Sequence, residues 1–139
     1  MSPAFAVDCS VALAWLFKDE ATAQTDQLLA RLDAECVVVP ALWFLELSNV
    51  IALAERRRRI TANQAAVFID EILKFDIEID HSAPSRSFTH LLPLCRVQQL
   101  TAYDAVYLDL ALQRQLPLAT LDEPLRKAAK RLGVKVLGS

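Results

Sequence analysis

Glycine and cysteine are scarce in this sequence of 139 residues. The only two glycines are Gly133 and Gly138, and no Ser/Pro-rich linker or internal repeat divides the chain, so one domain is expected over residues 1–139. The three cysteines, Cys9, Cys36 and Cys95, are odd in number and far apart, which predicts neither a disulfide framework nor a thiolate zinc site. They are expected to be reduced thiols of a cytoplasmic protein.

The sequence also lacks a dominant charge. It has 15 basic and 17 acidic residues, a net charge of -2, so no overall cationic field attracts nucleic acid or anionic lipid. Any site for a polyanion must therefore be local. Apolar residues make up 54% and charged residues 23% of the chain, a composition that excludes disorder and predicts a folded globular protein.

No uninterrupted hydrophobic run reaches membrane-spanning length. The longest apolar window, residues 36–54, contains Pro40, Glu46 and Asn49, and an acid in the middle of a bilayer costs about 3 kcal/mol. The beginning of the chain has no basic leader, and Asp8 interrupts its first apolar stretch. We therefore expect neither a membrane span nor a signal peptide, and a cytoplasmic location.

Short runs typical of strands alternate with longer helical patterns. The expected strands are 4–7, 36–39, 75–79, 118–120 and 134–137, and the expected helices are 9–17, 21–33, 41–58, 62–74, 84–98, 102–114 and 123–132. Thr61 with Gln64, and Thr101 with Asp104, have the spacing of capping boxes at helix starts. The alternation predicts a three-layer α/β/α domain with a mainly parallel five-stranded sheet.

Two acids directly follow expected strands. Asp8 ends the segment Phe5-Ala6-Val7-Asp8, and Asp122 comes after Leu118-Ala119-Thr120-Leu121. Ligand sites of open parallel sheets lie at the carboxyl ends of the strands, which places both acids where a site is expected. Each acid also precedes a predicted helix, so helix capping is the alternative explanation for either one alone.

Two further acids lie on predicted helices. Helical spacing places Glu46 on one stripe with Leu42, Leu45, Asn49, Val50 and Leu53, and a core-facing glutamate needs a polar or metal partner. The alternative is that Glu46 lies at the edge of the stripe and reaches solvent. Asp104 shares a stripe with Leu108 and Ala111, although as the third helical residue after Thr101 it also suits the helix dipole. Asp109 lies well round that helix and is expected to be solvated.

Carboxylates that converge on one cleft repel each other, which raises their pKa values or requires a cation between them. A site of carboxylates alone favours Mg²⁺ or Mn²⁺, and the corresponding chemistry is hydrolysis of phosphodiesters. His81 and His90 have no spacing typical of metal ligands and are expected on the surface or in loops.

Four segments resemble the PIN-domain ribonucleases, particularly the VapC-type toxins of type II toxin–antitoxin pairs. They are the opening strand with Asp8 and Ser10, the helix of residues 40–49 that holds Glu46, residues 100–105 around Asp104, and residues 118–122 ending at Asp122. The likeness extends over nearly the whole chain. One departure is Gln115, which stands where such proteins often have a glycine. How the preceding helix ends is therefore not predicted.

The resemblance implies a PIN-like fold and a metal-dependent endoribonuclease. Asp8, Glu46, Asp104 and Asp122 would form the acidic quartet that binds Mg²⁺ or Mn²⁺, with Asp8 and Asp104 as the principal ligands. Water activated by the metal would cut RNA to leave 5′-phosphate and 3′-hydroxyl ends. Polar side chains that would support the acids are Ser10, Asn49 and Thr120.

The resemblance further implies a homodimer and a cognate antitoxin of the VapB type. The run Leu42–Leu45 is apolar over four helical residues, so Trp43 or Phe44 could be exposed, and aromatics near residues 15–17 and 43–44 would suit contacts with partners. The alternative is a helix packed between two layers. Arg56 to Arg59 form the one dense basic run, either a contact for RNA phosphates or a solvated helix end.

Two other function classes remain open at this point. A receiver-like phosphoacceptor domain is also a small α/β fold with acids at strand ends, but it needs adjacent acids after the first strand, and here Cys9 follows Asp8. A non-catalytic interaction module that keeps the fold is the third reading.

Overall fold

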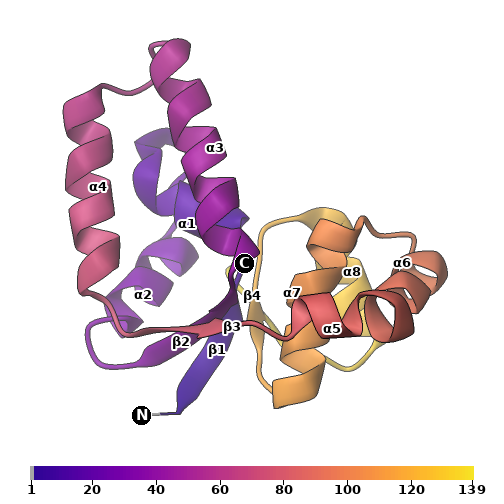
Figure 1. The fold of residues 1–139 in the computed structure, drawn as a ribbon. Coiled ribbons are helices and arrows are strands. Elements are labelled where there is room, and N and C mark those ends of the chain that lie inside the picture. Colours follow the sequence, from indigo (N-terminus) through magenta and orange to yellow (C-terminus); the bar gives the residue numbers. More distant parts are fainter. Residues whose placement is uncertain (1) are drawn as a thin grey trace.

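The computed structural model describes residues 2–139 and contains one sheet of five strands that all run parallel (Figure 1). The strand order is β3-β2-β1-β4-β5, so β1 lies at the centre. Ala6 of β1 pairs with Val38 of β2 on one side and with Leu118 of β4 on the other. The strands are β1 (Pro3–Val7), β2 (Cys36–Pro40), β3 (Ile77–Asp80), β4 (Leu118–Ala119) and β5 (Val136–Leu137).

The helices connect these strands. They are α1 (Cys9–Leu16), α2 (Ala23–Arg31), α3 (Leu42–Arg56), α4 (Ala62–Lys74), α5 (Ala83–Arg86), α6 (Leu92–Gln98), α7 (Ala102–Arg114) and α8 (Glu123–Arg131), with the short turns η1 (Lys18–Glu20) and η2 (Ser87–Leu91). Thr61 and Gln64 form the expected capping box at the start of α4.

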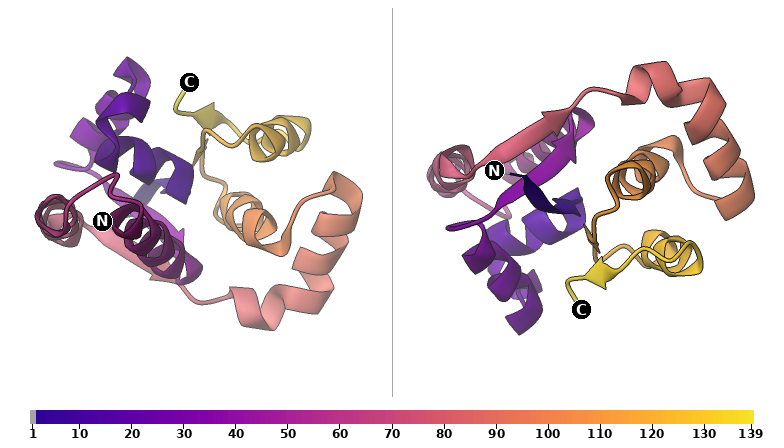
Figure 2. Two further views of the ribbon diagram at one scale, coloured as in Figure 1. Left: turned by 90° about the horizontal axis from the view of Figure 1, so that it is seen from above. Right: turned by 90° about the horizontal axis from the view of Figure 1, so that it is seen from below.

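The order of the strands explains the two helical layers. From β1 the chain moves outward to β2 and β3, then returns past β1 to β4 and continues to β5. Because crossovers between parallel strands are right-handed, connections that move in opposite directions cover opposite faces of the sheet. Helices α1 to α4 accordingly lie on one side and α5 to α8 on the other (Figure 2). The predicted α/β/α class and mainly parallel sheet are therefore confirmed.

This order also excludes one reading from the sequence. A receiver-like domain has the strand order 2-1-3-4-5, whereas this chain has β3-β2-β1-β4-β5. The receiver-like alternative is therefore wrong.

The central strands are buried on both faces. Phe5, Ala6 and Val7 of β1 and Val37 to Val39 of β2 are almost completely inaccessible to solvent, as expected for a parallel sheet covered by helices. Burying each Phe or Val side chain of this set stabilises the fold by about 1.5–3 kcal/mol. The core thus holds the carboxyl ends of β1 and β4 together.

Some element boundaries differ from the prediction. The third strand begins at Ile77 and not at Phe75, because Phe75 still caps the end of α4. The single helix expected over 84–98 is divided into α5, a π-helical turn over η2 and α6, and Pro93 lies in the first turn of α6, where its missing N–H is tolerated. Gln115 ends α7 in the left-handed conformation that glycine usually adopts there.

Helices α3 and α4 form a hairpin that extends away from the sheet (Figure 1). Within the described part of the chain, residues 2–139, no helix has both the length and the apolar character needed to span a membrane.

Candidate active site

Asp8 lies at the carboxyl end of β1 and caps the start of α1. Its Oδ1 accepts hydrogen bonds from the Ser10 hydroxyl at 2.6 Å and the Val11 N–H at 3.3 Å. Its Oδ2 accepts from the Thr120 hydroxyl at 2.5 Å. Only 5% of the residue is exposed, so a buried carboxylate is held by three donors from two strand ends.

Burial raises the pKa of Asp8 from 3.8 to about 6. The hydrogen bonds from Ser10, Thr120 and Val11 lower the pKa in part, whereas the charge of Asp122 raises it. Asp8 therefore stands close to another carboxylate in an environment that disfavours negative charge.

Asp122 reaches the same place from the end of β4. Its Oδ2 accepts from the Leu125 N–H at 3.0 Å, so it caps α8, and its own N–H donates to Thr120 Oγ1 at 3.1 Å. The Leu121 N–H donates to Ser10 Oγ at 2.8 Å, which ties the loop after β4 to the start of α1. Capping and a place beside Asp8 are thus compatible roles of one side chain.

Asp104 joins these acids from the first turn of α7. Its N–H donates to Thr101 Oγ1 at 3.1 Å, and the side chain is partly buried. Burial raises the pKa of Asp104, and the charges of Asp122 and Glu46 raise it further. Each of the four predicted acids therefore interacts electrostatically with at least one other.

Glu46 lies on α3, but not on the stripe that the sequence predicted. The buried residues of α3 are Trp43, Leu47, Ile51 and Ala54, whereas Leu45 and Asn49 are exposed. The expectation that Glu46 lies among core-facing residues is wrong: it lies half-buried at the edge of the apolar stripe. The buried stripe of α3 points in a different direction from the predicted one, because Trp43 fills the core at the first turn of the helix.

Two residues beside Glu46 did not emerge from the sequence as site residues. Glu46 Oε1 accepts hydrogen bonds from the Tyr107 hydroxyl and, at 3.7 Å, from the Cys9 thiol. Tyr107 lies one helical turn after Asp104, and Cys9 directly follows Asp8. These positions next to predicted acids are the signal that could have identified both residues.

The polar residues expected to support the acids differ in position. Ser10 and Thr120 both donate to Asp8, and their hydroxyls lie 3.5 Å apart. Asn49 is exposed on α3, and within residues 2–139 its side chain makes no hydrogen bond with the acids. His81 and His90 lie at the surface, as predicted.

Asp109 is not solvated, and that expectation is wrong. It is 7% exposed and receives two hydrogen bonds from Arg86, at 2.8 Å and 2.9 Å. The Gln113 side chain also donates to it at 3.1 Å. Arg86 of α5 supplies the positive charge that Asp109 needs in this buried position.

The donor chemistry of the four acids fits a hard divalent cation. Asp8, Glu46, Asp104 and Asp122 offer carboxylate oxygens, the ligands that Mg²⁺ and Mn²⁺ prefer, and the raised pKa values of Asp8 and Asp104 reflect burial and repulsion that a cation relieves. Among residues 2–139, however, no three Asp, Glu, His or Cys side chains are arranged closely enough to hold a metal ion unaided. Magnesium usually keeps several waters, which lets carboxylates act on it without direct contact.

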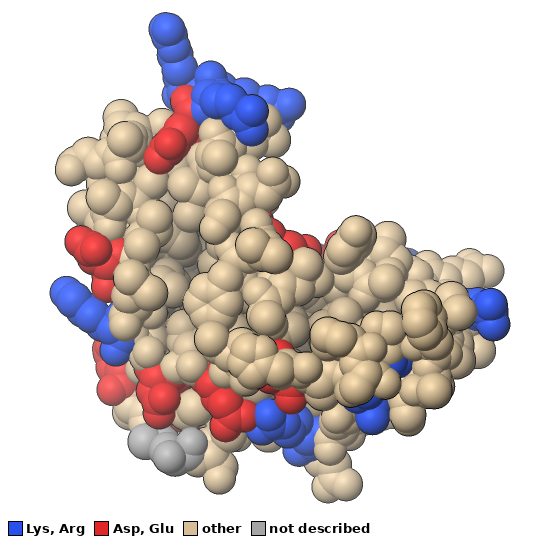
Figure 3. Space-filling model, viewed as in Figure 1, with Lys and Arg blue, Asp and Glu red and all other residues tan. Residues whose placement is uncertain are grey.

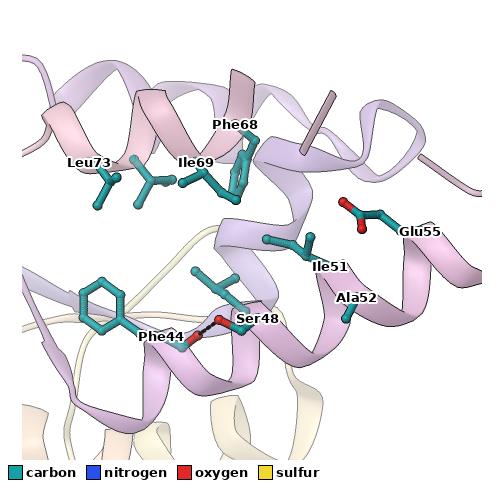
Figure 4. Close-up of a pocket in the computed structure, with 10 residues that line it drawn as sticks. Phe44, Ser48, Ile51, Ala52, Glu55, Phe68, Ile69 and Leu73 are labelled. Atoms are coloured by element: carbon teal, nitrogen blue, oxygen red, sulfur yellow. Dashed lines mark hydrogen bonds between the residues drawn. The ribbon is translucent and has the colours of Figure 1, made fainter. Parts of the chain in front are cut away.

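An apolar groove of about 310 Å³ lies between α3 and α4 (Figure 4), and none of the four acids lines it. Phe44 and Ile51 of α3 face Phe68 and Ile69 of α4 across it, and Glu55 is its one charged lining residue. Leu73, at its rim, is 71% exposed.

Basic side chains gather at the tip of the α3–α4 hairpin, and a hollow separates this hairpin from the helices of the other layer (Figure 3). Arg59 pairs there with Asp19 and Glu20 and stacks on the Phe17 ring at 3.6 Å. The other three residues of the run, Arg56 to Arg58, are exposed.

The comparisons with known proteins identify a family. A family model described as "PIN domain" matches residues 5–131. The crystal structure of PAE2754 from Pyrobaculum aerophilum is similar to this chain with a TM-score of 0.66 and 23% identity, over 98% of this chain and 92% of that one. No curated protein matches the chain.

Proposed function

Because the chain belongs to the PIN domain family, we propose that it is a metal-dependent endoribonuclease and the toxin of a type II toxin–antitoxin pair. The fold of this family is a nuclease fold. RNA as the substrate, Mg²⁺ or Mn²⁺ as the metal and the VapC-type role go beyond the family and belong to the proposal.

The observation that carries the proposal is the convergence of acids at the switch point of the sheet. Asp8 and Asp122 follow β1 and β4, the neighbouring strands at which the direction of the chain reverses. Open α/β sheets bind their ligands at this point. Asp104 adds a third carboxylate whose pKa responds to Asp122 and Glu46.

The chain's own residues have distinct tasks in this proposal. Asp8 and Asp104 would be the principal metal ligands, with Glu46 and Asp122 acting directly or through water. Ser10 and Thr120 hold the Asp8 carboxylate in one orientation, because each donates to a different oxygen. When bound, the divalent ion supplies activation of the attacking water and stabilisation of the charge that develops on the phosphate.

Hydrolysis by water predicts products with 5′-phosphate and 3′-hydroxyl ends. The RNA 2′-hydroxyl then takes no part in bond breaking. Products with 2′,3′-cyclic phosphate ends would contradict this mechanism.

A VapB-type antitoxin and a homodimer complete the proposed assembly. Of the aromatics that the sequence offered for such contacts, Trp15, Phe17 and Trp43 are buried, whereas Phe44 is half-buried and lines the groove between α3 and α4. Exposed apolar side chains lie on the α3–α4 hairpin, where Leu45 and Leu73 are each about 70% exposed, and on η2 and α6, where Phe88 and Val97 are 84% and 75% exposed. The mass of the partner-free protein in solution tests the dimer, and a monomer at micromolar concentration would contradict it.

The decisive experiment is cleavage of single-stranded RNA by purified, partner-free protein with Mg²⁺, with Mn²⁺ and with a chelator, followed by mapping of the product ends. The Asp8→Asn variant should lose the metal-dependent cleavage. Asp33→Asn, which changes an exposed aspartate beyond α2, is the matched control and should retain it. If no variant and no wild-type sample cuts diverse RNAs, the non-catalytic module becomes the better reading.

A further inference from the structure

Side chains from three separate helices meet at one oxygen of Glu46. Tyr107 of α7 donates its hydroxyl to Oε1, and Cys9 of α1 approaches the same oxygen from 3.7 Å. The Cys9 sulfur also lies 3.6 Å from the Tyr107 hydroxyl and donates to the Trp43 carbonyl at 3.4 Å. The position of Oε1 is thus defined from α1, α3 and α7 together.

The two oxygens of Glu46 differ in their surroundings. Oε1 accepts the Tyr107 hydroxyl proton and shares the single Cys9 thiol proton with the Trp43 carbonyl, whereas Oε2 has no hydrogen-bond partner within residues 2–139. A carboxylate that is anchored through one oxygen has lost most of its rotational freedom, and its second oxygen remains free to bind. The interaction between Glu46 and Asp104 indicates that the glutamate charge is felt at the acidic cluster.

The anchoring groups are themselves rigid. Tyr107 is 2% exposed and packs in the core, and the Cys9 thiol is bound to the backbone of α3 through Trp43. The Tyr107 hydroxyl and the Cys9 thiol each carry one proton and act as donors in these contacts.

We propose that Tyr107 is a positioning residue, assisted by Cys9, which fixes Glu46 Oε1 so that Oε2 is presented to the divalent cation of the acidic cluster. This inference rests on the proposed function, because it assigns a cation to Asp8, Asp104 and Asp122. Tyr107 itself touches neither metal nor substrate.

A structural role is the competing explanation, since a buried tyrosine hydroxyl needs some hydrogen-bond partner. The two roles differ in what the loss of the hydroxyl changes. A structural hydroxyl contributes to the free energy of unfolding alone. A positioning hydroxyl also contributes to the affinity for metal, by about 10- to 100-fold for groups that orient a ligand.

The test is the affinity of the full chain for Mn²⁺, measured by calorimetry and by the electron paramagnetic resonance signal of the free ion. Tyr107→Phe keeps the ring and removes the hydroxyl, and it should weaken Mn²⁺ binding by about tenfold or more. The chain has only two tyrosines, and Tyr103→Phe on the exposed face of the same helix is the matched control, with affinity unchanged. Cys9→Ala should weaken binding less, because its thiol is the more distant donor.

Cleavage of RNA provides a second measurement. If Tyr107→Phe acts through the metal, raising the Mn²⁺ concentration should restore most of its rate. High Mn²⁺ would also rescue a partly unfolded variant, because an ion that binds the folded state stabilises it, so this comparison requires variants that are folded without metal. Circular dichroism tests whether each variant is folded. If Tyr107→Phe does not fold, Cys9→Ala becomes the test, and an unchanged Mn²⁺ affinity of Cys9→Ala overturns the proposal.

The outcomes separate this inference from the proposed function. Equal Mn²⁺ affinity of wild type and Tyr107→Phe overturns the positioning role and leaves the nuclease proposal standing. Weaker binding in Tyr107→Phe without RNA cleavage by the wild type supports the positioning role and contradicts the ribonuclease. A wild type that binds no Mn²⁺ overturns both.

Discussion

The Thr120 hydroxyl donates to Asp8 Oδ2 at 2.5 Å across 112 residues of sequence. This bond links the residues that follow the paired ends of β1 and β4, Val7 and Ala119. The completely buried Thr120 also accepts the Asp122 N–H, so one hydroxyl orients two of the four acids.

Thr120→Val should destabilise the protein, and more strongly at about pH 8 than at about pH 4. Valine keeps the shape but removes the donor from a buried carboxylate, and hydrogen bonds to charged groups contribute about 1.5–3 kcal/mol. At the lower pH Asp8 is protonated, and the lost bond is one to a neutral group. Urea unfolding at both pH values measures the difference. Thr120→Ser is the control, and an equal loss at both pH values would contradict the assigned donor.

Asp8→Asn should stabilise the metal-free protein above pH 6. Burial raises the pKa of Asp8 from its ordinary value of 3.8 to about 6, so the folded state binds this proton more tightly than the unfolded state does. Wild-type stability should therefore fall as pH rises from about 4 to about 6, and the charged side chain then costs up to about 3 kcal/mol. Thermal unfolding with a chelator should show a higher melting temperature for the variant at about pH 8 and no gain below about pH 4. A gain that does not depend on pH would argue against titration of Asp8.

Asp109→Ala should be strongly destabilising, because it leaves Arg86 partly buried without its partner. The side chains of Arg86 and Asp109 are 23% and 10% exposed, and removal of one partner from such a pair leaves the other charge uncompensated. Arg86→Met in the same chain should recover part of the loss, as a double-mutant cycle would show. Glu35→Ala breaks the more exposed Arg31–Glu35 pair, whose side chains are 38% and 33% exposed, and should cost much less than Asp109→Ala.

Reversing Arg56 and Arg57 to glutamate should weaken RNA binding and reduce its dependence on salt. Each phosphate contact contributes about one unit to the slope of log affinity against log salt concentration. Fluorescence anisotropy in the metal-free Asp8→Asn background measures binding without cleavage. Lys74→Glu with Lys135→Glu makes the same change in charge beside the amino ends of β3 and β5, opposite the acids, and is the control. If both pairs have the same effect, the arginine run is a solvated helix end.

The class of fold could be predicted because the patterns that indicate it are local in the sequence. Apolar runs of strand length alternate with helical periodicity, and this is sufficient to predict a parallel sheet covered on both faces. Asp8 and Asp122 were identifiable as neighbours because each follows a strand, and parallel strands bring their carboxyl ends to one edge. That the four acids bind a metal, and that Ser10, Asn49 and Thr120 support them, remains a prediction.

The errors came from contacts that periodicity does not describe. Helix α3 is apolar on more than one side, since Trp43 faces the core while Phe44 faces the groove with α4. The apolar stripe predicted to contain Glu46 was therefore placed on the wrong side of the helix. Asp109 was expected in solvent because its partner Arg86 lies 23 residues earlier, on another element. Tyr107 can be recognised as a site residue only when it is known that Cys9 of α1 and Glu46 of α3 lie beside it.

The central place of β1 has a consequence for synthesis on the ribosome. β1 emerges from the ribosome well before its neighbour β4 and before Asp122, which follows β4. Pairing over such a long separation in sequence is slow compared with local helix formation. A nascent chain therefore cannot assemble its four acids before Asp122 has emerged, and until then the proposed nuclease would be inactive.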